Sequence, residues 1–274
     1  MRPQLTKRVI LLLDVLGFRD LATGKEAQAN LESLHRALAK VHDFSADDVK
    51  VYSDNALVCW SLHEDKGEPI ASEGPLGSSL LDAARFQFEL TRHGFYARGA
   101  ITVGDIYVDE HLIFGPGLVD AYDLETKVAV HPRVVLSQRA VSLARQHLSM
   151  YARPSFSPHH TLILWGSDDK FFLNYLGWLF EDDSEEAIYQ ELLKHRDGIV
   201  KNLKKHAAIA SVWDKYRWLA NYHDFICGDA FPSRRELLVA EDAEVAFKFF
   251  TNKVRRPRRK QAPMSPSRRR GGAA

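Results

Sequence analysis

Two aspartates at the ends of predicted strands are the residues of this sequence best suited to metal chemistry. Asp14 interrupts the apolar run 8–16, and Asp54 separates two β-rich runs, 49–53 and 55–62. Neighbouring antiparallel strands would bring the two carboxylates together, which is costly unless a cation neutralises them. A Mg²⁺ ion held by two carboxylates and substrate phosphates is the usual arrangement for nucleotide chemistry. A single aspartate at a strand end is also a common turn residue, so both interpretations stay open at this point.

The first part of the chain alternates strand and helix patterns, and this alternation decides where the aspartates lie. The β-branched and leucine-rich run at 8–16 predicts a buried central strand, closed by Gly17. Apolar spacing of three, four and seven residues predicts the helices. The elements expected in order are a strand at 8–16, a helix at 18–42, strands at 49–53 and 55–62 around an Asp54-Asn55 turn, a loop at 63–76 and a helix at 77–93.

The rest of the chain continues the same alternation and then becomes helical. The expected elements are strands at 96–103 and 106–108 around a Gly104-Asp105 hairpin, a helix from Gly115-Pro116-Gly117 to about 128, a strand at 134–136, a helix capped by Ser137 and ending near 147, a hairpin of 161–165 with 170–175, and two helices in 184–226 divided near Ala207. This order predicts an α/β sandwich, a mainly antiparallel sheet covered by helices, with a C-terminal helical extension. The expected domains are a catalytic core at 1–150, a hairpin and helical extension at 151–251 packed on it, and a disordered basic tail at 252–274.

Composition excludes several classes of protein. With 45% hydrophobic and 27% charged residues in 274, the chain can bury a large core. The segment 252–274 holds nine Lys or Arg and no acid, so residues 1–251 carry 28 basic and 36 acidic residues and will not attract nucleic acid by themselves. Cys59 and Cys227 are expected to be buried small hydrophobes in a reducing compartment. No apolar run approaches the roughly 20 residues of a membrane span, so we expect a cytoplasmic protein.

Four segments in register resemble the class III nucleotide cyclases. In that family an aspartate is followed three residues later by Gly-Phe, a second aspartate lies in a hairpin about forty residues on, an Arg-Gly strand follows, and a helix ends in Leu-Glu. The matching segments here are LLLDVLGF (11–18), VYSDNALV (51–58), ARGAITVGDIY (97–107) and GPGLVDAYDLE (115–125). The resemblance covers roughly residues 8–136.

This resemblance implies roles for particular residues. Asp14 and Asp54, with the backbone of Val15, would hold two divalent ions, Mg²⁺ or Mn²⁺. The backbone from Val15 to Phe18, including Gly17, would approach the triphosphate at the start of the following helix. Arg98 would contact phosphate, or would form a salt bridge at the strand end.

The departures from the family pattern bear on the substrate. Purine cyclases usually carry an Asn and an Arg four residues apart in the fourth segment. Here Asp120, or Val119, stands in place of the Asn, and no Arg follows. The adenine-reading aspartate falls near Leu112 or Ile113, whose side chains cannot hydrogen-bond a base. A standard adenylate or guanylate cyclase is therefore not expected.

The Pycsar cyclases, which make cyclic pyrimidine nucleotides in bacterial antiphage defence, are more similar. Tyr52 and Ser53 before Asp54 match their second segment. An inward-facing Tyr52 would narrow the pocket toward a single ring, or would be an ordinary strand aromatic. The resemblance implies conversion of UTP to cyclic UMP. CTP or a purine triphosphate as substrate, a non-catalytic nucleotide-binding regulator, and nucleic-acid binding through the basic tail remain the alternatives.

Partners follow from the same resemblance. A homodimer with shared active sites is implied, together with a separate effector activated by the cyclic nucleotide and no stable membrane association. The aromatic stretch 212–227 is expected to pack in the core or in a dimer interface, with Lys215 and His223 as its candidate site residues. His159 and His160 lack spaced metal-binding partners and are expected to be solvated.

Overall fold

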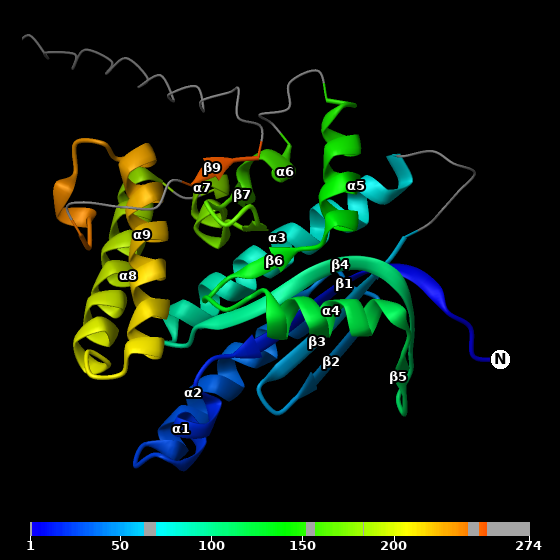
Figure 1. Cartoon of the computed structure of the whole chain (residues 1–274), viewed down its shortest axis with the longest axis horizontal. Coiled ribbons are helices and arrows are strands. Elements are labelled where there is room, and N and C mark those ends of the chain that lie inside the picture. Colours follow the sequence, from blue (N-terminus) through cyan, green and yellow to red (C-terminus); the bar gives the residue numbers. More distant parts are fainter. Residues whose placement is uncertain (1, 63–69, 152–156, 183, 241–246, 251–274) are drawn as a thin grey trace, which may run out of the picture.

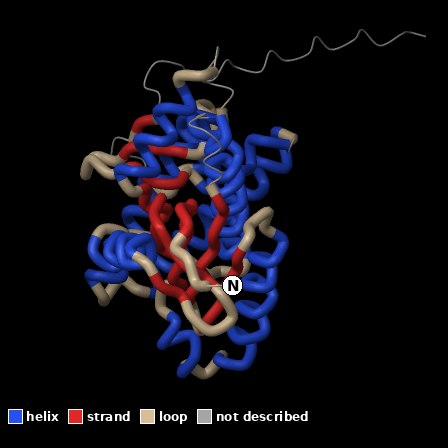
Figure 2. Tube along the Cα trace, turned by 90° about the vertical axis from the view of Figure 1, so that its right-hand side faces the viewer, coloured by secondary structure: helices blue, strands red, loops and turns tan. Residues whose placement is uncertain are grey.

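A long mixed sheet runs through the protein, with helices on both faces. The computed structural model describes residues 2–62, 70–151, 157–182, 184–240 and 247–250. Figure 1 shows α3 and α4 on opposite sides of the strands, and Figure 2, turned by 90°, shows strands in the middle with helices on either side. The predicted α/β sandwich with a mainly antiparallel sheet is confirmed.

Strand order explains how segments far apart in the sequence meet. The order is β2-β3-β1-β4-β6-β8-β7-β9, with β5 paired to β4. The β4–β6 pair is parallel, and the other pairs are antiparallel. The strands are β1 (Thr6–Val15), β2 (Asp48–Tyr52), β3 (Asn55–Ser61), β4 (Ala97–Val108), β5 (Ile113–Phe114), β6 (Val134–Leu136), β7 (Ile163–Trp165), β8 (Phe171–Leu173) and β9 (Lys248–Phe249).

The central strand β1 is apolar on both faces because both are covered. Val9 and Leu11 belong to the larger core, which also contains Leu80 of α3. Ile10 and Leu12 belong to a smaller core beneath α4. A strand buried on two sides needs the continuous apolar run that predicted it.

The helices mostly fall where periodicity placed them. They are α1 (Phe18–Thr23), α2 (Ala27–Ala39), α3 (Ile70–Arg92), α4 (Pro116–Lys127), α5 (Gln138–Leu148), α6 (Pro158–Thr161), α7 (Leu179–Asp182), α8 (Glu185–Lys205) and α9 (Ala210–Ala230), with 3-10 turns η1 (Lys40–Asp43), η3 (Tyr175–Trp178) and η4 (Arg235–Leu237). Ser137 caps α5 as predicted, its hydroxyl accepting from the Ala140 N–H at 3.1 Å. None of the helices in the described ranges has the length and apolar character needed to cross a membrane.

The predicted Gly104-Asp105 hairpin is wrong. β4 runs unbroken from Ala97 to Val108 and pairs with the whole of β1. The reason for glycine at 104 is close packing, because a Cβ there would lie 2.9 Å from the Cα of Gly117 in α4. The glycine lets α4 approach the sheet and does not mark a turn.

Two further boundaries differ from the sequence prediction. The β2–β3 turn consists of Ser53 and Asp54, since Tyr52 pairs with Asn55, so the turn begins one residue earlier than the predicted Asp54-Asn55 pair. Ser53 takes the left-handed conformation there, with φ of 57°. The predicted loop at 63–76 is also wrong in its second half, because α3 begins at Ile70 and accommodates Pro75.

Two predictions about buried and exposed side chains have opposite outcomes. Cys59 and Cys227 are fully buried, as predicted. His159 and His160, predicted to be solvated, are 0% and 2% exposed. The error arises because α6 folds into the core. There His159 Nε2 lies 3.1 Å from His147 Nδ1, within hydrogen-bonding distance.

The expected C-terminal extension shares the sheet of the core. β8 pairs with β6, which continues the strand order into the extension. The long helices α8 and α9 pack on each other and stand at one end of the sheet (Figure 1). The predicted basic tail, 252–274, lies outside the described residues.

Candidate active site

Strand register brings the two aspartates to the same end of the sheet. Asp14 on β1 lies between Asn55 on β3 and Arg98 on β4. The Val15 N–H donates to the carbonyl oxygen of Asp54 at 3.0 Å, which ties the end of β1 to the β2–β3 turn. Residues forty positions apart in the sequence therefore become neighbours.

The Asp14 carboxyl group is poorly stabilised as an anion. Burial raises its pKa, and the nearby Asp54 carboxylate raises it further, while Arg98 acts in the opposite direction. The Asp14 side chain is 19% exposed, so the group still reaches solvent. Two acids held this close, with one of them partly buried, form a place where a cation is favoured.

Arg98 links Asp14 to a third acid, Glu125. Its Nε lies 3.0 Å from Asp14 Oδ2 and 2.8 Å from Glu125 Oε1. Glu125 reaches the site from α4 and is 3% exposed, and burial raises its pKa despite the opposing effect of Arg98. The structure thus places Arg98 in the ion pair that was the alternative to a phosphate contact. Glu125 was not among the predicted site residues, although the Leu-Glu ending of the fourth segment marks it.

The turn after β1 presents backbone groups to the same end of the sheet. Gly17 has a φ of 78°, which lets the chain turn sharply into α1 at Phe18. The N–H groups of Val15 and Leu16 already donate to the carbonyl oxygens of Asp54 and Tyr96. Of the four residues from Val15 to Phe18, only Gly17 and Phe18 therefore have amides that could bind phosphate.

Tyr52 and Ser53 lie at the tip of the β2–β3 hairpin beside Asp54. Tyr52 is 45% exposed, and its partial burial raises the pKa of the phenol. The ring is therefore not enclosed within this chain. It is accessible from solvent, next to the turn that carries one of the two aspartates.

The donor set fits a divalent cation of the magnesium type. Asp14 and Asp54 offer carboxylate oxygens, and the backbone carbonyl of Val15 lies beside them in sequence. The described residues contain no group of three or more His, Cys, Asp or Glu side chains that could hold a metal ion. Two carboxylates are consistent with an ion that takes its remaining ligands from water and substrate phosphate.

Comparisons with known proteins give structural likeness only. No family model matches the chain, and no curated protein matches it in sequence. The adenylyl cyclase CyaB from P. aeruginosa is similar with a TM-score of 0.48 and 14% identity over 68% of this chain and 98% of that one. The guanylyl cyclase domain of RhoGC from Blastocladiella emersonii gives 0.45 and 10% over 64% and 98%. That of RhGC from Catenaria anguillulae in complex with GTP gives 0.41 and 10% over 62% and 96%.

Proposed function

We propose that this protein is a nucleotidyl cyclase that converts UTP to 3′,5′-cyclic UMP and pyrophosphate. The observation that carries the proposal is the juxtaposition of Asp14 and Asp54 at the end of the sheet, where burial and the second carboxylate make a bound cation favourable. The cyclase-type segments around both aspartates support the same assignment. The structural likenesses described above are too distant to carry it.

In this proposal the chain's own residues position the triphosphate and the ribose. The Asp14 and Asp54 carboxylates hold divalent ions, Mg²⁺ or Mn²⁺, and the amides of Gly17 and Phe18 face the phosphates. Bound ions would lower the pKa of the ribose 3′ hydroxyl and offset the charge on the phosphates.

The bond changes follow from in-line displacement. The ribose 3′ oxygen loses its proton to water and bonds to the α-phosphorus. The bond from that phosphorus to the bridging oxygen breaks, and its electron pair leaves on pyrophosphate. Arg98 acts as a positioning residue in this scheme, because it holds Asp14 through Nε and ties it to α4.

The preference for a pyrimidine rests on Tyr52 and on the missing purine-cyclase residues. An accessible Tyr52 beside Asp54 is available to close one side of a base pocket and to offer its hydroxyl to the base edge. The position that carries Asn in purine cyclases corresponds to Asp120 or Val119, and Asp120 is paired with Arg139 at 3.0 Å. In this proposal cyclic UMP is made in the cytoplasm and acts as a second messenger in antiphage defence. A separate effector protein binds it.

A homodimer with shared active sites is part of the proposal. Large apolar side chains are exposed on β5, on α4 and in the turn before them: Leu112, Phe114, Val119 and Tyr122 are 50–61% exposed. β5 and the start of α4 are neighbours in Figure 1. A surface of this kind is suited to bury area against a second copy of the chain.

A non-catalytic nucleotide-binding regulator is the second candidate. Arg98 occupies one oxygen of Asp14 and also pairs with Glu125, so the cluster is partly neutralised without a metal ion. A protein with this arrangement could bind a nucleotide without turnover. CTP is the alternative substrate if the protein is an enzyme.

The test is a substrate panel. The purified full-length protein is incubated with each of the four ribonucleoside triphosphates and Mn²⁺, and cyclic monophosphates and pyrophosphate are measured by mass spectrometry. Cyclic UMP that disappears in Asp54→Asn supports the proposal. Cyclic CMP, cyclic AMP or cyclic GMP would reassign the substrate, whereas binding of UTP without any cyclic product would favour the regulator.

A further inference from the structure

The C-terminal helices reach the end of the sheet that carries Asp14. Tyr96, just before β4, packs its ring against Tyr216 of α9 with a centroid distance of 5.3 Å. Its hydroxyl lies 3.1 Å from the position that a Cβ on Gly198 of α8 would occupy. The Tyr96 carbonyl also accepts from the Leu16 N–H at 2.8 Å. One residue thus ties both long helices to the chain segment that leaves β1.

The turn between α8 and α9 faces α1 as well. Burial lowers the pKa of His206 at the end of α8, and the Asp20 carboxylate on α1 opposes this shift. The His206 ring stacks on Tyr216, with a centroid distance of 5.6 Å. The turn after β1 and the start of α9 therefore lie on the same side of the proposed site.

Lys215 lies one helical turn before Trp218 on α9, and the Trp218 ring stacks on His131 with a centroid distance of 5.3 Å. His131 leads into β6, whose Val134 pairs with Gly99 next to Arg98, so this part of α9 lies at the end of the sheet where β4 begins. Burial lowers the pKa of the Lys215 ammonium group, the Arg98 guanidinium adds to this effect, and the Asp14 carboxylate opposes it. The side chain is partly buried. Within the part of the chain that the structure describes, its Nζ forms no salt bridge and no hydrogen bond.

The two basic side chains at this end of the sheet, Arg98 and Lys215, differ in whether they have carboxylate partners. Arg98 is engaged by two carboxylates, Asp14 and Glu125. Lys215 lies on the helix that packs over the start of β4, and within the described residues it forms an ion pair with neither Asp14 nor Glu125, whose partner is Arg98. An unpaired cation next to a site for a polyanion is well placed to bind phosphate oxygens.

We propose that Lys215 binds the phosphate chain of the nucleotide held at Asp14 and Asp54, so that the C-terminal extension completes the active site. This inference rests on the proposed function for its substrate, a nucleoside triphosphate. The extension that carries Lys215 is joined to the core by the pairing of β8 with β6.

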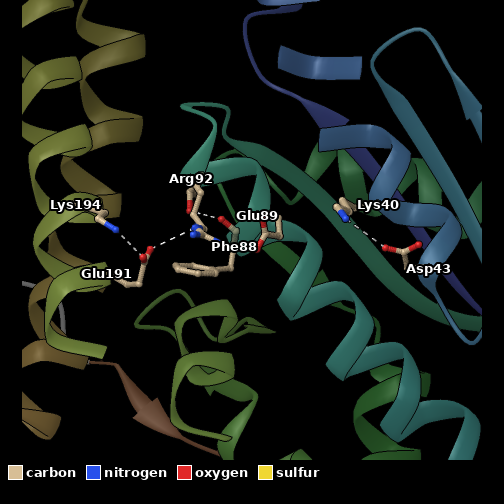
Figure 3. A network of polar contacts seen from close by, with 8 residues as sticks. Lys40, Asp43, Phe88, Glu89, Arg92, Glu191 and Lys194 are labelled. Atoms are coloured by element: carbon tan, nitrogen blue, oxygen red, sulfur yellow. Dashed lines mark hydrogen bonds and ion pairs between the residues drawn. The ribbon is translucent and has the colours of Figure 1, made fainter. Parts of the chain in front are cut away.

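A second contact fixes α8, which packs against the helix that carries Lys215, α9. Figure 3 shows Arg92 at the end of α3 between Glu89 and Glu191, with Lys194 on the other side of Glu191. Arg92 Nε lies 3.4 Å from Glu191 Oε2, and Lys194 Nζ lies 2.8 Å from Glu191 Oε1. Together with Tyr96, this ion-pair network holds α8 against the core and so restricts where α9 can place Lys215.

The test separates binding from turnover. Affinity for inorganic tripolyphosphate is measured by calorimetry in the presence of Mg²⁺, and KM and kcat are measured with the triphosphate that is turned over. Lys215→Ala should weaken tripolyphosphate binding and raise KM by about 10-fold or more, with a smaller change in kcat. Lys215→Arg should recover part of the loss, because it restores the charge. Lys204→Ala, an exposed lysine on α8, is the matched control and should match the wild type.

The outcomes distinguish this inference from the proposed function. Lys215-dependent tripolyphosphate binding without any cyclic product would retain the phosphate site and reject the cyclase. Normal KM and normal tripolyphosphate affinity in Lys215→Ala, in a protein that makes a cyclic product, would reject the role of Lys215 alone. A wild type that does not bind tripolyphosphate would also overturn it. Circular dichroism of each variant establishes that the fold is retained.

Discussion

Two polar regions of this protein differ in how their buried groups are satisfied. Near η3, the Tyr222 hydroxyl donates to Asn174 Oδ1 at 2.7 Å and accepts from the Leu176 N–H at 2.9 Å. Asn174 in turn donates to the Thr161 carbonyl at 2.9 Å. At the other region, around Asp14, acids share one arginine. Glu125 Oε1 lies at ion-pair distance from Arg98 and has no hydrogen bond of good geometry.

A chain of imidazoles extends the satisfied region. The Tyr175 hydroxyl lies 2.7 Å from His195 Nε2, the two Nδ1 atoms of His195 and His223 are 3.0 Å apart, and His223 Nε2 lies 2.9 Å from the Leu237 carbonyl. If His223 Nε2 carries a proton and donates it to that carbonyl, His223 Nδ1 accepts from His195 Nδ1, and His195 Nε2 accepts from the Tyr175 hydroxyl. Each donor then has an acceptor, and both imidazoles are neutral. His223, a candidate site residue by sequence, is part of this core. Complete pairing stabilises the fold, whereas the incomplete pairing around Asp14 suits a ligand.

Removing one acid of the incomplete cluster should give the largest functional effect with little cost in stability. Asp54→Asn should reduce turnover by about three orders of magnitude, because the loss of a metal-binding carboxylate removes several kcal/mol of transition-state stabilisation. Stability should stay equal or rise, since the charge that raises the pKa of Asp14 is gone. Steady-state turnover and the urea midpoint measure the two quantities.

Asp123→Asn is the matched control for this change. Asp123 is a half-exposed α4 residue paired with Lys127 at 2.9 Å, and its removal should leave turnover unchanged. An Asp54→Asn protein with wild-type turnover would show that the cluster is structural.

A change in the hydrogen-bonded region around Tyr222 should reduce stability and have little effect on turnover. Tyr222→Phe leaves the Leu176 N–H and Asn174 Oδ1 without their partner in a buried site, and should cost about 2–4 kcal/mol of unfolding free energy. Turnover per folded molecule should change little. Urea unfolding with a fixed m-value measures the cost. Tyr189→Phe removes an exposed hydrogen bond to Glu236 Oε1 at 3.2 Å and should cost much less, so an equal loss in both variants would argue against the network.

The site was more predictable from sequence than the packing around it. Asp14 and Asp54 could be placed together because each was expected at the end of a strand, and antiparallel pairing of neighbouring strands brings such ends together. The Gly104-Asp105 error shows the limit, since a glycine needed for the approach of α4 has the same local signature as a turn. The burial of His159 and the packing of Tyr216 of α9 on Tyr96 before β4 depend on contacts between segments far apart in the chain, which periodicity does not report.

Acid should weaken the buried histidine regions. Burial lowers the pKa values of His159 and His223 to about 4. The unfolded chain therefore binds protons that the folded chain does not, at pH values between about 6.5 and 4. The stabilisation is complete above pH 6.5 and is lost as the pH falls, by about 1.4 kcal/mol per pH unit for each imidazole.

The measurement is the unfolding free energy between pH 7 and 5 in wild type and His159→Gln. The slope of the unfolding free energy against pH gives the number of protons bound on unfolding, and in His159→Gln this number should be about one smaller than in the wild type. His35→Gln, at an exposed position, should keep the wild-type slope. The difference between variants isolates the imidazole, because Asp14 and Glu125, whose raised pKa values act with the opposite sign, are present in both. Parallel slopes would mean that the pKa of His159 is the same in the folded and unfolded chains.

The smallest effect is expected where an ion pair is exposed. Arg139 and Asp120 lie 3.0 Å apart with side chains 66% and 46% exposed, so solvent screens their attraction. Arg139→Gln should change the unfolding free energy by less than about 0.5 kcal/mol, measured by urea unfolding beside Asp120→Asn and the double variant. A coupling energy of several kcal/mol in the double-variant cycle would contradict the view that exposure makes this ion pair weaker than the Arg98 cluster. A small coupling energy between Arg139 and Asp120 would support burial as the reason why the charges around Arg98 have larger effects than an exposed pair.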